Sequence, residues 1–383
     1  MRPRGDTVIV GGGVIGLALA FELLRREARR VVVVERARPG SGATRAAGGM
    51  LAPVSEAETE DADTIALGLD SLSRYPQVVE DVERIASIPT GFDVSGTLWV
   101  ACRRDDRAEI DRCAAALAPH GPGIERLSGE AVRRLEPRLS GRVESGIRVP
   151  GEGQIDPRRF AAALARAVAV LGGRILSDTA VTAIEGGSSG CLTVRARDSA
   201  GASLRVDATE VVLAAGAWSF RDITGPIADP GLRPIKGQLV RLRGPRLLRH
   251  VVRTPRTYLL SRADGELLVG ATVEEMGFDD RPTAGAIVEL LRGAWEVLPS
   301  TEDLAFVETS VGFRSALDDH RPRIGPTKVE GLFLAVGHYR NGVLLAPATA
   351  AYLADAIVDR RTPAAIAPFE PERAIQSARS VEA

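Results

Sequence analysis

The chain has 383 residues, which is long for one domain and suits two, with ample length to bury a core. Its 49 basic and 50 acidic side chains nearly balance, so no overall charge favours nucleic acid or an anionic membrane surface as a partner. We therefore expect small-molecule partners.

Cysteine and histidine are too scattered to indicate a disulfide framework or a metal site. The three cysteines (Cys102, Cys113 and Cys191) fit no metal-binding spacing and leave an odd number, which suits a reducing compartment. No two of the four histidines stand four residues apart, so we expect no metal. The sequence also has no apolar run long enough to span a membrane and no apolar signal core, so we expect a cytoplasmic protein.

The first stretch of the chain is typical of dinucleotide binding. A β-branched run, a glycine-rich turn, an apolar helical face and a second buried run follow one another at residues 7–10, 11–16, 17–26 and 31–34. Gly11 permits a tight turn, Gly13 lets the backbone approach a pyrophosphate, and Gly16 lets the helix lie close to the strand. Amides at the helix start face the phosphate charge. Glu35, nineteen residues after Gly16, can accept hydrogen bonds from ribose hydroxyls.

A second loop of small residues follows at 41–50 and indicates that something bulky passes close to the backbone. An NAD enzyme has no particular need for such a loop. An FAD protein must run its long cofactor past a second loop to reach the isoalloxazine ring, so the loop favours FAD. A flexible linker is the alternative, but it fits badly because residues 50–53 are apolar.

The middle of the chain predicts elements outside the cofactor core and then a return to it. Asp156 is a helix cap and Pro157 suits the first turn of a helix, so together they predict the helix that follows. Alternation at period two predicts a β-meander before an apolar strand that ends in glycine. The expected helices are 62–86, 105–118, 128–135 and 160–171; the expected strands are 97–101, 174–176, 180–184, 191–197, 204–206 and 211–218, with a hairpin loop at 186–190.

The last part of the chain predicts a second sheet and a third segment of the cofactor domain. Strands at 234–242, 258–260, 267–270 and 306–314 and a helix at 285–298 indicate a mixed antiparallel sheet. A buried strand at 332–337 and a long apolar helix at 342–358 complete the pattern.

The expected fold class is α/β (α+β mixed). It combines a Rossmann-like FAD-binding domain, discontinuous in sequence, with a substrate domain built on a mixed, largely antiparallel sheet. We expect the FAD-binding domain at 1–86, 148–224 and 312–372, the substrate-binding domain at 87–147 and 225–311, and a tail at 373–383.

Three segments, 11–50, 214–219 and 337–349, resemble the D-amino-acid oxidase superfamily of flavoproteins. Within it the chain looks most like the glycine oxidases of thiamin biosynthesis, on residues 48–53, 267–272 and 338–349. The resemblance covers nearly the whole chain. It implies noncovalent FAD, oxidation of an amine at its α-carbon and dioxygen as electron acceptor, and by family analogy a homo-oligomer such as a tetramer.

Cofactor contacts follow from the fingerprint and from the resemblance. Related sarcosine oxidases tether flavin through a cysteine near residues 318–320, and no cysteine stands there. The expected cofactor-binding residues are Gly11, Gly13, Val14, Ile15, Gly16, Glu35, Arg36, Ala43, Thr44, Gly48, Gly49, Met50, Val181, Gly216, Trp218, His338, Tyr339, Arg340, Asn341, Gly342, Val343 and Leu344.

Substrate contacts are expected at Arg314, Arg340, Tyr258 and Met50. A guanidinium can hold both oxygens of an amino-acid carboxylate and so fix the α-carbon over the flavin. Arg314 ends an apolar strand, where a clamp explains it; the alternative is a salt bridge to Asp318 or Asp319. For Arg340 the alternative to a substrate contact is an ordinary loop arginine. For Tyr258 the alternative is a residue that only packs within its strand.

No acid or base is assigned. A neutral amine can assist hydride departure through its lone pair, which fits the lack of a histidine or carboxylate in the expected site segments. Amides at a helix start at Asn341 and Gly342 can face the flavin pyrimidine edge, where charge accumulates on reduction. Glycine oxidases usually have Pro-Gly after the clamp arginine, whereas Ser315 stands here, and Val273 stands where methionine is common, so the pocket shape is expected to differ.

The expected activity is oxidative deamination of glycine or a similar small amino acid, giving an oxoacid, ammonia and hydrogen peroxide and supplying the imine for thiamin thiazole synthesis. Alternatives are an oxidase of sarcosine or D-amino acids and a dehydrogenase of the same fold with a quinone or carrier protein as acceptor. A further alternative is an NAD-dependent dehydrogenase or a noncatalytic nucleotide-binding module.

Overall fold

A computed structural model describes residues 7–26, 30–57, 60–117, 123–186 and 190–374. Within these ranges no helix combines the length and the apolar character needed to cross a bilayer. A cytoplasmic location stays a prediction.

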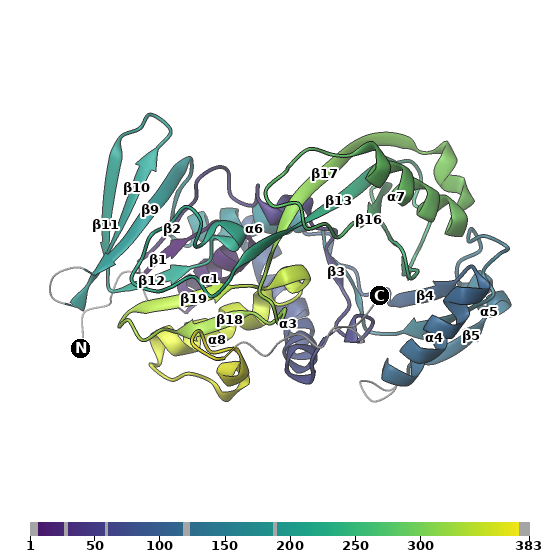
Figure 1. Cartoon of the computed structure of the whole chain (residues 1–383), viewed down its shortest axis with the longest axis horizontal. Helices are drawn as coiled ribbons and strands as arrows, with labels where there is room; N and C mark the ends of the chain where they lie inside the picture. The colour runs from purple at the N-terminus through teal and green to yellow at the C-terminus, as the bar shows by residue number, and fades with distance from the viewer. Residues whose placement is uncertain (1–6, 27–29, 58–59, 118–122, 187–189, 375–383) are drawn as a thin grey trace.

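A six-stranded sheet forms the centre of one half of the molecule, in the order β18-β19-β12-β1-β2-β8 (Figure 1). The β1 strand pairs in parallel with β2 on one side and β12 on the other, and β18 pairs antiparallel with β19. Runs of valine, isoleucine and leucine form these strands because both sheet faces are covered. The strands are β1 (Thr7–Val10), β2 (Val31–Val34), β8 (Arg174–Leu176), β12 (Glu210–Leu213), β18 (Arg323–Pro326) and β19 (Leu332–Val336).

Alternate residues of the central strands enter two separate cores. Ile9 and Val33 lie in a cluster with the helices, whereas Val8 and Val10 lie in a cluster with a three-stranded sheet on the opposite face. This is the period-two alternation of a strand that is buried on both sides. The helices are α1 (Val14–Arg25), α3 (Ala62–Ala86), α6 (Pro157–Val170) and α8 (Ala346–Val358); the strands opposite are β9 (Thr179–Gly186), β10 (Leu192–Asp198) and β11 (Ser203–Ala208).

The other half is an eight-stranded sheet in the order β17-β13-β16-β15-β14-β4-β6-β5. Only β14 and β4 pair in parallel, so the sheet is mixed and largely antiparallel, as expected. Its strands are β4 (Thr97–Ala101), β5 (Glu125–Ser128), β6 (Ser145–Val149), β13 (Arg233–Arg243), β14 (Val251–Arg253), β15 (Tyr258–Ser261), β16 (Glu266–Gly270) and β17 (Ala305–Ala316); its helices are α4 (Arg104–Leu117), α5 (Gly129–Leu135) and α7 (Ala284–Val297).

Short elements connect the two halves. The strands β3 (Met50–Leu51) and β7 (Gly153–Gln154) pair antiparallel, and α2 (Ala43–Ala46) lies between β2 and β3 in the chain. Short 3-10 turns occur at η4 (Gly216–Trp218), η5 (Pro299–Asp303), η6 (Tyr339–Asn341) and η7 (Ala364–Phe369). The predicted fold class is confirmed. The domain boundaries stay a prediction, and two of them, at 147/148 and 311/312, fall inside β6 and β17.

Three predicted elements are wrong in detail. The strand expected at 211–218 ends at Leu213, and Gly216–Trp218 form the η4 turn instead. The strand at 174–176 does not belong to the meander, because β8 pairs in parallel with β2 at the edge of the six-stranded sheet. The last helix begins at Ala346 instead of residue 342, after the η6 turn. The centre of the predicted hairpin loop (187–189), residue 118 of the predicted helix at 105–118 and most of the tail lie outside the described residues.

Candidate active site

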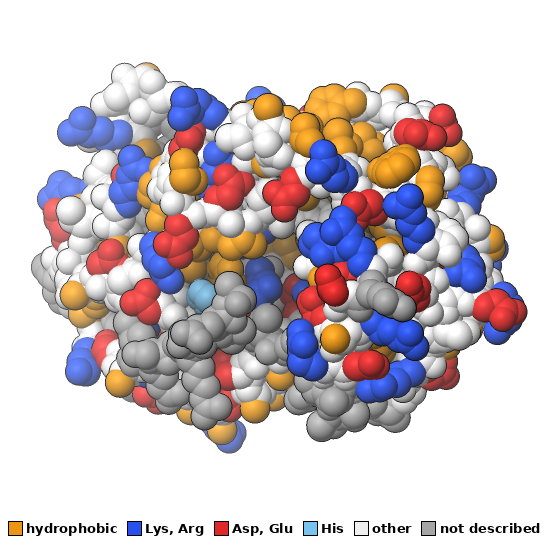
Figure 2. All heavy atoms as spheres, turned by 45° about the vertical axis from the view of Figure 1, so that its right-hand side comes forward, with side chains coloured by type: hydrophobic (Ala, Val, Ile, Leu, Met, Phe, Trp, Pro, Cys, Tyr) orange, Lys and Arg blue, Asp and Glu red, His pale blue; other side chains and the backbone are white. Residues whose placement is uncertain are grey.

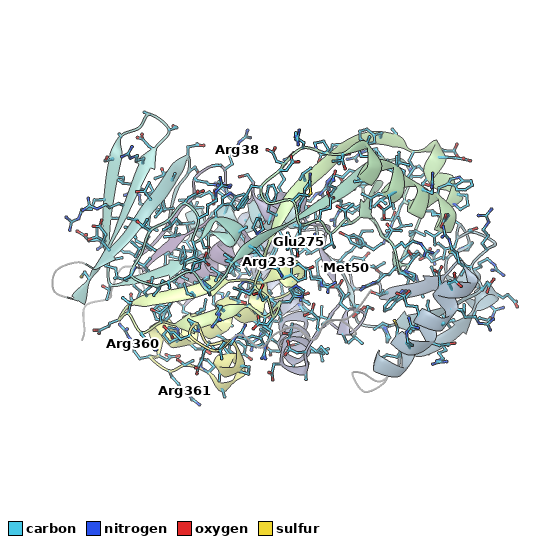
Figure 3. All side chains as sticks on the ribbon, in the orientation of Figure 1. Arg38, Met50, Arg233, Glu275, Arg360 and Arg361 are labelled. Carbon is cyan, nitrogen blue, oxygen red and sulfur yellow. The ribbon has the colours of Figure 1, made fainter. Side chains whose placement is uncertain are left out.

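A cavity of about 600 Å³ extends from the turn between β1 and α1 to the strands β13, β15 and β17. Figure 2 shows a hollow in the middle of one face, with hydrophobic side chains in its depth and side chains of both charges around it. Figure 3 places Met50, a cavity-lining residue, in the middle of the molecule between the two large sheets. The cavity therefore brings together segments from the whole length of the chain.

Most of the predicted site residues line this cavity. Gly16, Asn341 and Leu344 do not line it. Gly16 instead lets α1 approach the strand, because a Cβ there would lie 2.0 Å from the Gly11 carbonyl oxygen. The residues that line it are Gly11, Gly13, Val14, Ile15, Glu35, Arg36, Ala43, Thr44, Gly48, Gly49, Met50, Val181, Gly216, Trp218, Tyr258, Arg314, His338, Tyr339, Arg340, Gly342 and Val343.

The turn between β1 and α1 has the geometry that its glycines predict. Gly11 has a φ of 112°, and a Cβ on it would lie 2.4 Å from the Ala214 carbonyl oxygen. The Glu35 carboxylate at the end of β2 accepts hydrogen bonds from the Gly12 and Ala37 amides at 2.7 and 3.0 Å. The Val14 amide donates to the Thr44 hydroxyl at 3.0 Å, which joins the helix start to the second loop.

The second loop is fixed by contacts that only small residues allow. Gly49 has a φ of 84°, and a Cβ there would lie 2.0 Å from the Ile155 carbonyl oxygen. A Cβ on Gly48 would lie 2.7 Å from the Tyr258 hydroxyl, and the Gly48 carbonyl accepts a 2.7 Å hydrogen bond from the buried Arg262 guanidinium. The loop is therefore a close-packed wall of the cavity.

Arg314 lies on β17 with its guanidinium over Gly237 of the neighbouring strand. A Cβ on Gly237 would lie 2.5 Å from Arg314 Nη1, and Nη1 donates to the Thr272 and Lys236 carbonyls at 3.0 and 3.4 Å. The predicted alternative partners are engaged elsewhere, because Asp318 pairs with Arg233 and Asp319 with Arg373. Within the described part of the chain, the polar contacts of Arg314 are thus with carbonyl oxygens and with no carboxylate.

Tyr258 lies beside this guanidinium. Burial raises the pKa of the Tyr258 hydroxyl, and the positive charge of Arg314 partly offsets that rise. The hydroxyl therefore stays protonated and can donate a hydrogen bond into the cavity. Tyr258 also packs closely on Gly270, where a Cβ would lie 2.2 Å from its ring, so the packing role is present and the substrate contact stays a prediction.

Arg340 reaches the cavity from the η6 turn and, unlike Arg314, faces carboxylates. Its Nε lies 3.2 Å from Glu60 Oε1, and the Glu56 carboxylate acts on it as well. Burial alone would lower the pKa of Arg340, but Glu56 and Glu60 outweigh burial and raise it. Tyr339, at a φ of 47°, stacks on His320 with ring centroids 4.5 Å apart and fixes the turn.

His338 cannot supply a positive charge at the site. Burial lowers the pKa of its imidazole to about 3, and Nε2 lies 3.1 Å from the Thr349 hydroxyl of α8. Neutral His338 is therefore a structural link between the η6 turn and α8. At the far end of the cavity, the Arg36 guanidinium stacks on the Trp218 ring at 3.9 Å from its centroid.

The expectation that no carboxylate stands in the site segments is wrong. Glu56 lines the cavity and pairs with Arg253, which lines it too, at 3.3 Å; Arg256 lines it and pairs with Asp106 at 2.8 Å. Sequence reasoning missed these residues because β14 and the chain after β3 meet only through the tertiary fold. The acidic residues shortly after Met50 were the only feature of the sequence that pointed to a carboxylate in the site.

The family model described as FAD dependent oxidoreductase (DAO) matches residues 6–356. The chain belongs to this family. The expected relationship to the D-amino-acid oxidase superfamily is confirmed, and with it the expectation of an FAD-dependent amino-acid oxidase.

Several named proteins are similar in sequence to nearly the whole chain. The glycine oxidase of Geobacillus kaustophilus (strain HTA426) is 34% identical over 98% of both chains. The crystal structure of glycine oxidase from Geobacillus kaustophilus matches with a TM-score of 0.88 at 33% identity, over 97% of this chain and 100% of that chain. A bifunctional protein ThiO/ThiG of Synechocystis sp. is 35% identical over 97% of this chain, which spans 54% of that protein. The hydrogen cyanide synthase subunit HcnC of Pseudomonas aeruginosa is 30% identical over 96% of both.

The cavity fits the cofactor of the family. Four of its glycines, Gly13, Gly42, Gly216 and Gly342, face space in which an added Cβ would meet no atom closer than 3.5 Å. Gly13 lies at the start of α1, where amides point toward an anion, so the pyrophosphate of FAD would lie there. Glu35 would take the ribose and the second loop would contact the flavin. The noncovalent attachment and the single contacts stay predictions.

Proposed function

We propose that this FAD-dependent oxidase acts on glycine or a similarly small amino acid, with dioxygen as electron acceptor. The observation that carries the proposal is Arg314, a guanidinium at the cavity wall that contacts carbonyl oxygens and no carboxylate among the described residues. A positive charge without an ionic partner in a sheltered cavity favours an anionic ligand. An amino-acid carboxylate meets that requirement.

The residues around the guanidinium support binding and orientation. Arg314 would take both carboxylate oxygens, Tyr258 would donate its hydroxyl to one of them, and Arg340 would contribute a second positive charge. Gly48 and Met50 border the same space and limit the size of the substrate side chain. Two anchored oxygens fix the direction of the α-carbon, which is the contribution of orientation to the rate.

FAD, when bound, accepts the hydride from the substrate α-carbon and passes two electrons to dioxygen. Arg314 and its neighbours need only hold the carboxylate while the neutral amine assists the departure of the hydride. The Glu56 carboxylate is paired with Arg253, so we assign it no proton transfer. The overall reaction is glycine, dioxygen and water giving glyoxylate, ammonia and hydrogen peroxide.

A place in thiamin biosynthesis is part of the proposal. It is supported by the 35% identity to the bifunctional protein ThiO/ThiG of Synechocystis sp., 54% of which the chain spans. The product chemistry agrees, since a small imine is what the oxidation of glycine releases before hydrolysis. A homo-oligomer is proposed by family analogy and a cytoplasmic location from the cysteine usage.

A substrate panel tests the proposal. We expect glycine to release hydrogen peroxide with a kcat/KM at least about tenfold above D-proline and L-amino acids, because Gly48 and Tyr258 leave little room beside the α-carbon. Sarcosine and D-alanine complete the panel. If sarcosine or a D-amino acid is the best substrate, the alternative oxidase activity replaces glycine oxidation.

The choice between oxidase and dehydrogenase needs a separate experiment. The chain is also 30% identical to a hydrogen cyanide synthase subunit, so the relatives do not all have the name of an oxidase. We expect substrate-reduced enzyme to reoxidise rapidly on mixing with oxygenated buffer and to form one equivalent of peroxide. Slow reoxidation without peroxide, together with fast reoxidation by a quinone, would establish the dehydrogenase.

A further inference from the structure

Glu60 is a buried carboxylate that does not line the cavity but contacts two residues of the η6 turn. Its side chain is 6% exposed. Its Oε1 lies 3.2 Å from the Nε of Arg340 and accepts a 3.1 Å hydrogen bond from the Asn341 side-chain amide. Glu60 thus holds the turn from a position outside the cavity lining.

Arg314 and Arg340, which both line the cavity, therefore differ in the charges around them. Arg314 contacts carbonyls, whereas Arg340 is partly neutralised by Glu60 and by Glu56. A substrate carboxylate that approaches Arg340 must compete with the negative charge of Glu60 behind it. In a sheltered site such a charge acts over several ångströms with little screening.

We propose that Glu60 is a positioning residue that holds Arg340 in place and, through its own charge, sets how strongly Arg340 binds a substrate carboxylate. The inference rests on the proposed function, in that Arg314 and Arg340 receive an amino-acid carboxylate. It adds a residue outside the cavity lining whose protonation controls substrate affinity.

The surroundings of Glu60 allow this control near neutral pH. Burial raises the pKa of Glu60 to about 7; Arg340 and the Asn341 hydrogen bond oppose the rise, and Glu56 and Asp61 reinforce it. The charged and titratable groups around these residues are Arg253, which pairs with Glu56, Arg321, which pairs with Asp61, and His320, which stacks on Tyr339. Burial and the charge of Arg340 lower the pKa of His320 from its usual value, so His320 titrates at lower pH than Glu60. Below about pH 7 Glu60 is neutral and only Glu56 offsets the charge of Arg340; above it, Glu60 is ionised and offsets that charge as well.

The charge of Glu60 determines how the affinity for a carboxylate ligand changes with pH. A carboxylate ligand binds more tightly below about pH 7 and more weakly above it, by about tenfold for one charge at this kind of separation. By linkage, binding of the ligand at pH 7 must raise the pKa of Glu60 and take up protons. A residue with only a structural role would move neither quantity.

The experiment titrates the FAD-loaded enzyme with acetate, which carries a carboxylate and no amine, and follows the flavin absorbance between pH 6 and pH 8.5. We expect the wild-type dissociation constant to rise about tenfold over this range. Glu60→Gln keeps an oxygen for Arg340 and Asn341 but removes the charge. It should bind acetate at all pH values with the affinity that the wild type shows at low pH, and take up no protons.

Asp61→Asn is the matched control. Asp61 is adjacent, pairs with Arg321 and caps α3, a role that asparagine retains. This variant should keep the pH dependence, with a midpoint shifted slightly downward because one negative charge near Glu60 is gone. The neutral ligand acetamide should show no pH dependence with any variant.

Three results would overturn the inference. The first is a Glu60→Gln variant with the same pH dependence as the wild type, and the second is a Glu60→Gln variant with weaker acetate binding than the wild type at every pH. A pH-independent wild type would overturn it as well, whether or not the variant folds. Because acetate binding requires no turnover, a failure of glycine to react would count against the proposed function and leave this test intact.

Discussion

Replacing Arg314 by alanine is expected to raise the KM for glycine about 100-fold or more while FAD stays bound. The guanidinium contacts only carbonyls of the described residues, so its charge is available to the substrate. Truncating one partner of a buried charge pair costs about 2–5 kcal/mol, and 100-fold corresponds to about 2.7 kcal/mol. Steady-state kinetics together with the flavin spectrum of the purified variant measure both parts of the prediction.

Two further variants separate orientation from charge and from general disturbance. Arg314→Lys keeps a positive charge but cannot hold both carboxylate oxygens, so it should lower kcat as well as raise KM. Arg233→Ala removes an arginine outside the cavity lining that pairs with Glu275 at 2.9 Å, and it should leave KM within about twofold (Figure 3). A KM for Arg314→Ala equal to that of the wild type would remove Arg314 from the substrate site.

Elements whose ends carry local chemical signals could be predicted from the sequence. Asp156 accepts hydrogen bonds from the Arg158 and Arg159 amides, and Pro157 occupies the first turn of α6. These signals act within a few residues of one another, so the sequence contains all that determines them. The same holds for β1 and the glycine turn, where Gly11 and Gly16 serve the close contacts expected of them.

Pairing partners could not be predicted in the same way. The strand at Arg174–Leu176 has the alternation of its neighbours in the chain, yet it pairs with Val32–Val34, far away in sequence. Alternation predicts a strand but not its partner. The predicted start of α8, at residue 342, differs from the observed start for another reason. Pro347 lacks an amide hydrogen, so it favours the first turn of a helix that begins at Ala346 over the interior of one that begins at Gly342.

The charge balance of the site is the part that needed the structure. Arg314 and Arg340 have the same side chain and both line the cavity, but only Arg340 has carboxylates against it. That difference arises because the tertiary fold brings Glu56 and Glu60 close to the η6 turn, which is far from them in sequence. The sequence could suggest two carboxylate-binding arginines but not that only one of them lies against carboxylates of the described residues.

Gly13→Val is expected to abolish FAD binding and leave the protein folded. Gly13 has a φ of −74° and a ψ of 178°, which any residue adopts, and an added Cβ would meet only the Thr44 hydroxyl at 3.5 Å. The protein can therefore accept a Cβ at this position, which borders the open cavity. The cofactor cannot, because the side chain would fill the space at the start of α1 where the pyrophosphate would lie. Absorbance should show no flavin after reconstitution, while far-ultraviolet circular dichroism should match the wild-type apoprotein.

Gly16→Ala is the contrasting variant, because its effect should arise in the fold and not in the cavity. A Cβ at Gly16 would lie 2.0 Å from the Gly11 carbonyl oxygen, so α1 must shift away from β1, at a cost of about 1–3 kcal/mol or more. Its apoprotein should melt at a clearly lower temperature, whereas the Gly13→Val apoprotein should melt close to the wild-type apoprotein. If Gly13→Val binds FAD normally, the pyrophosphate does not lie at this turn. If both variants lose stability equally, Gly13 is a packing glycine like Gly16, and the open space beside it has no part in cofactor binding.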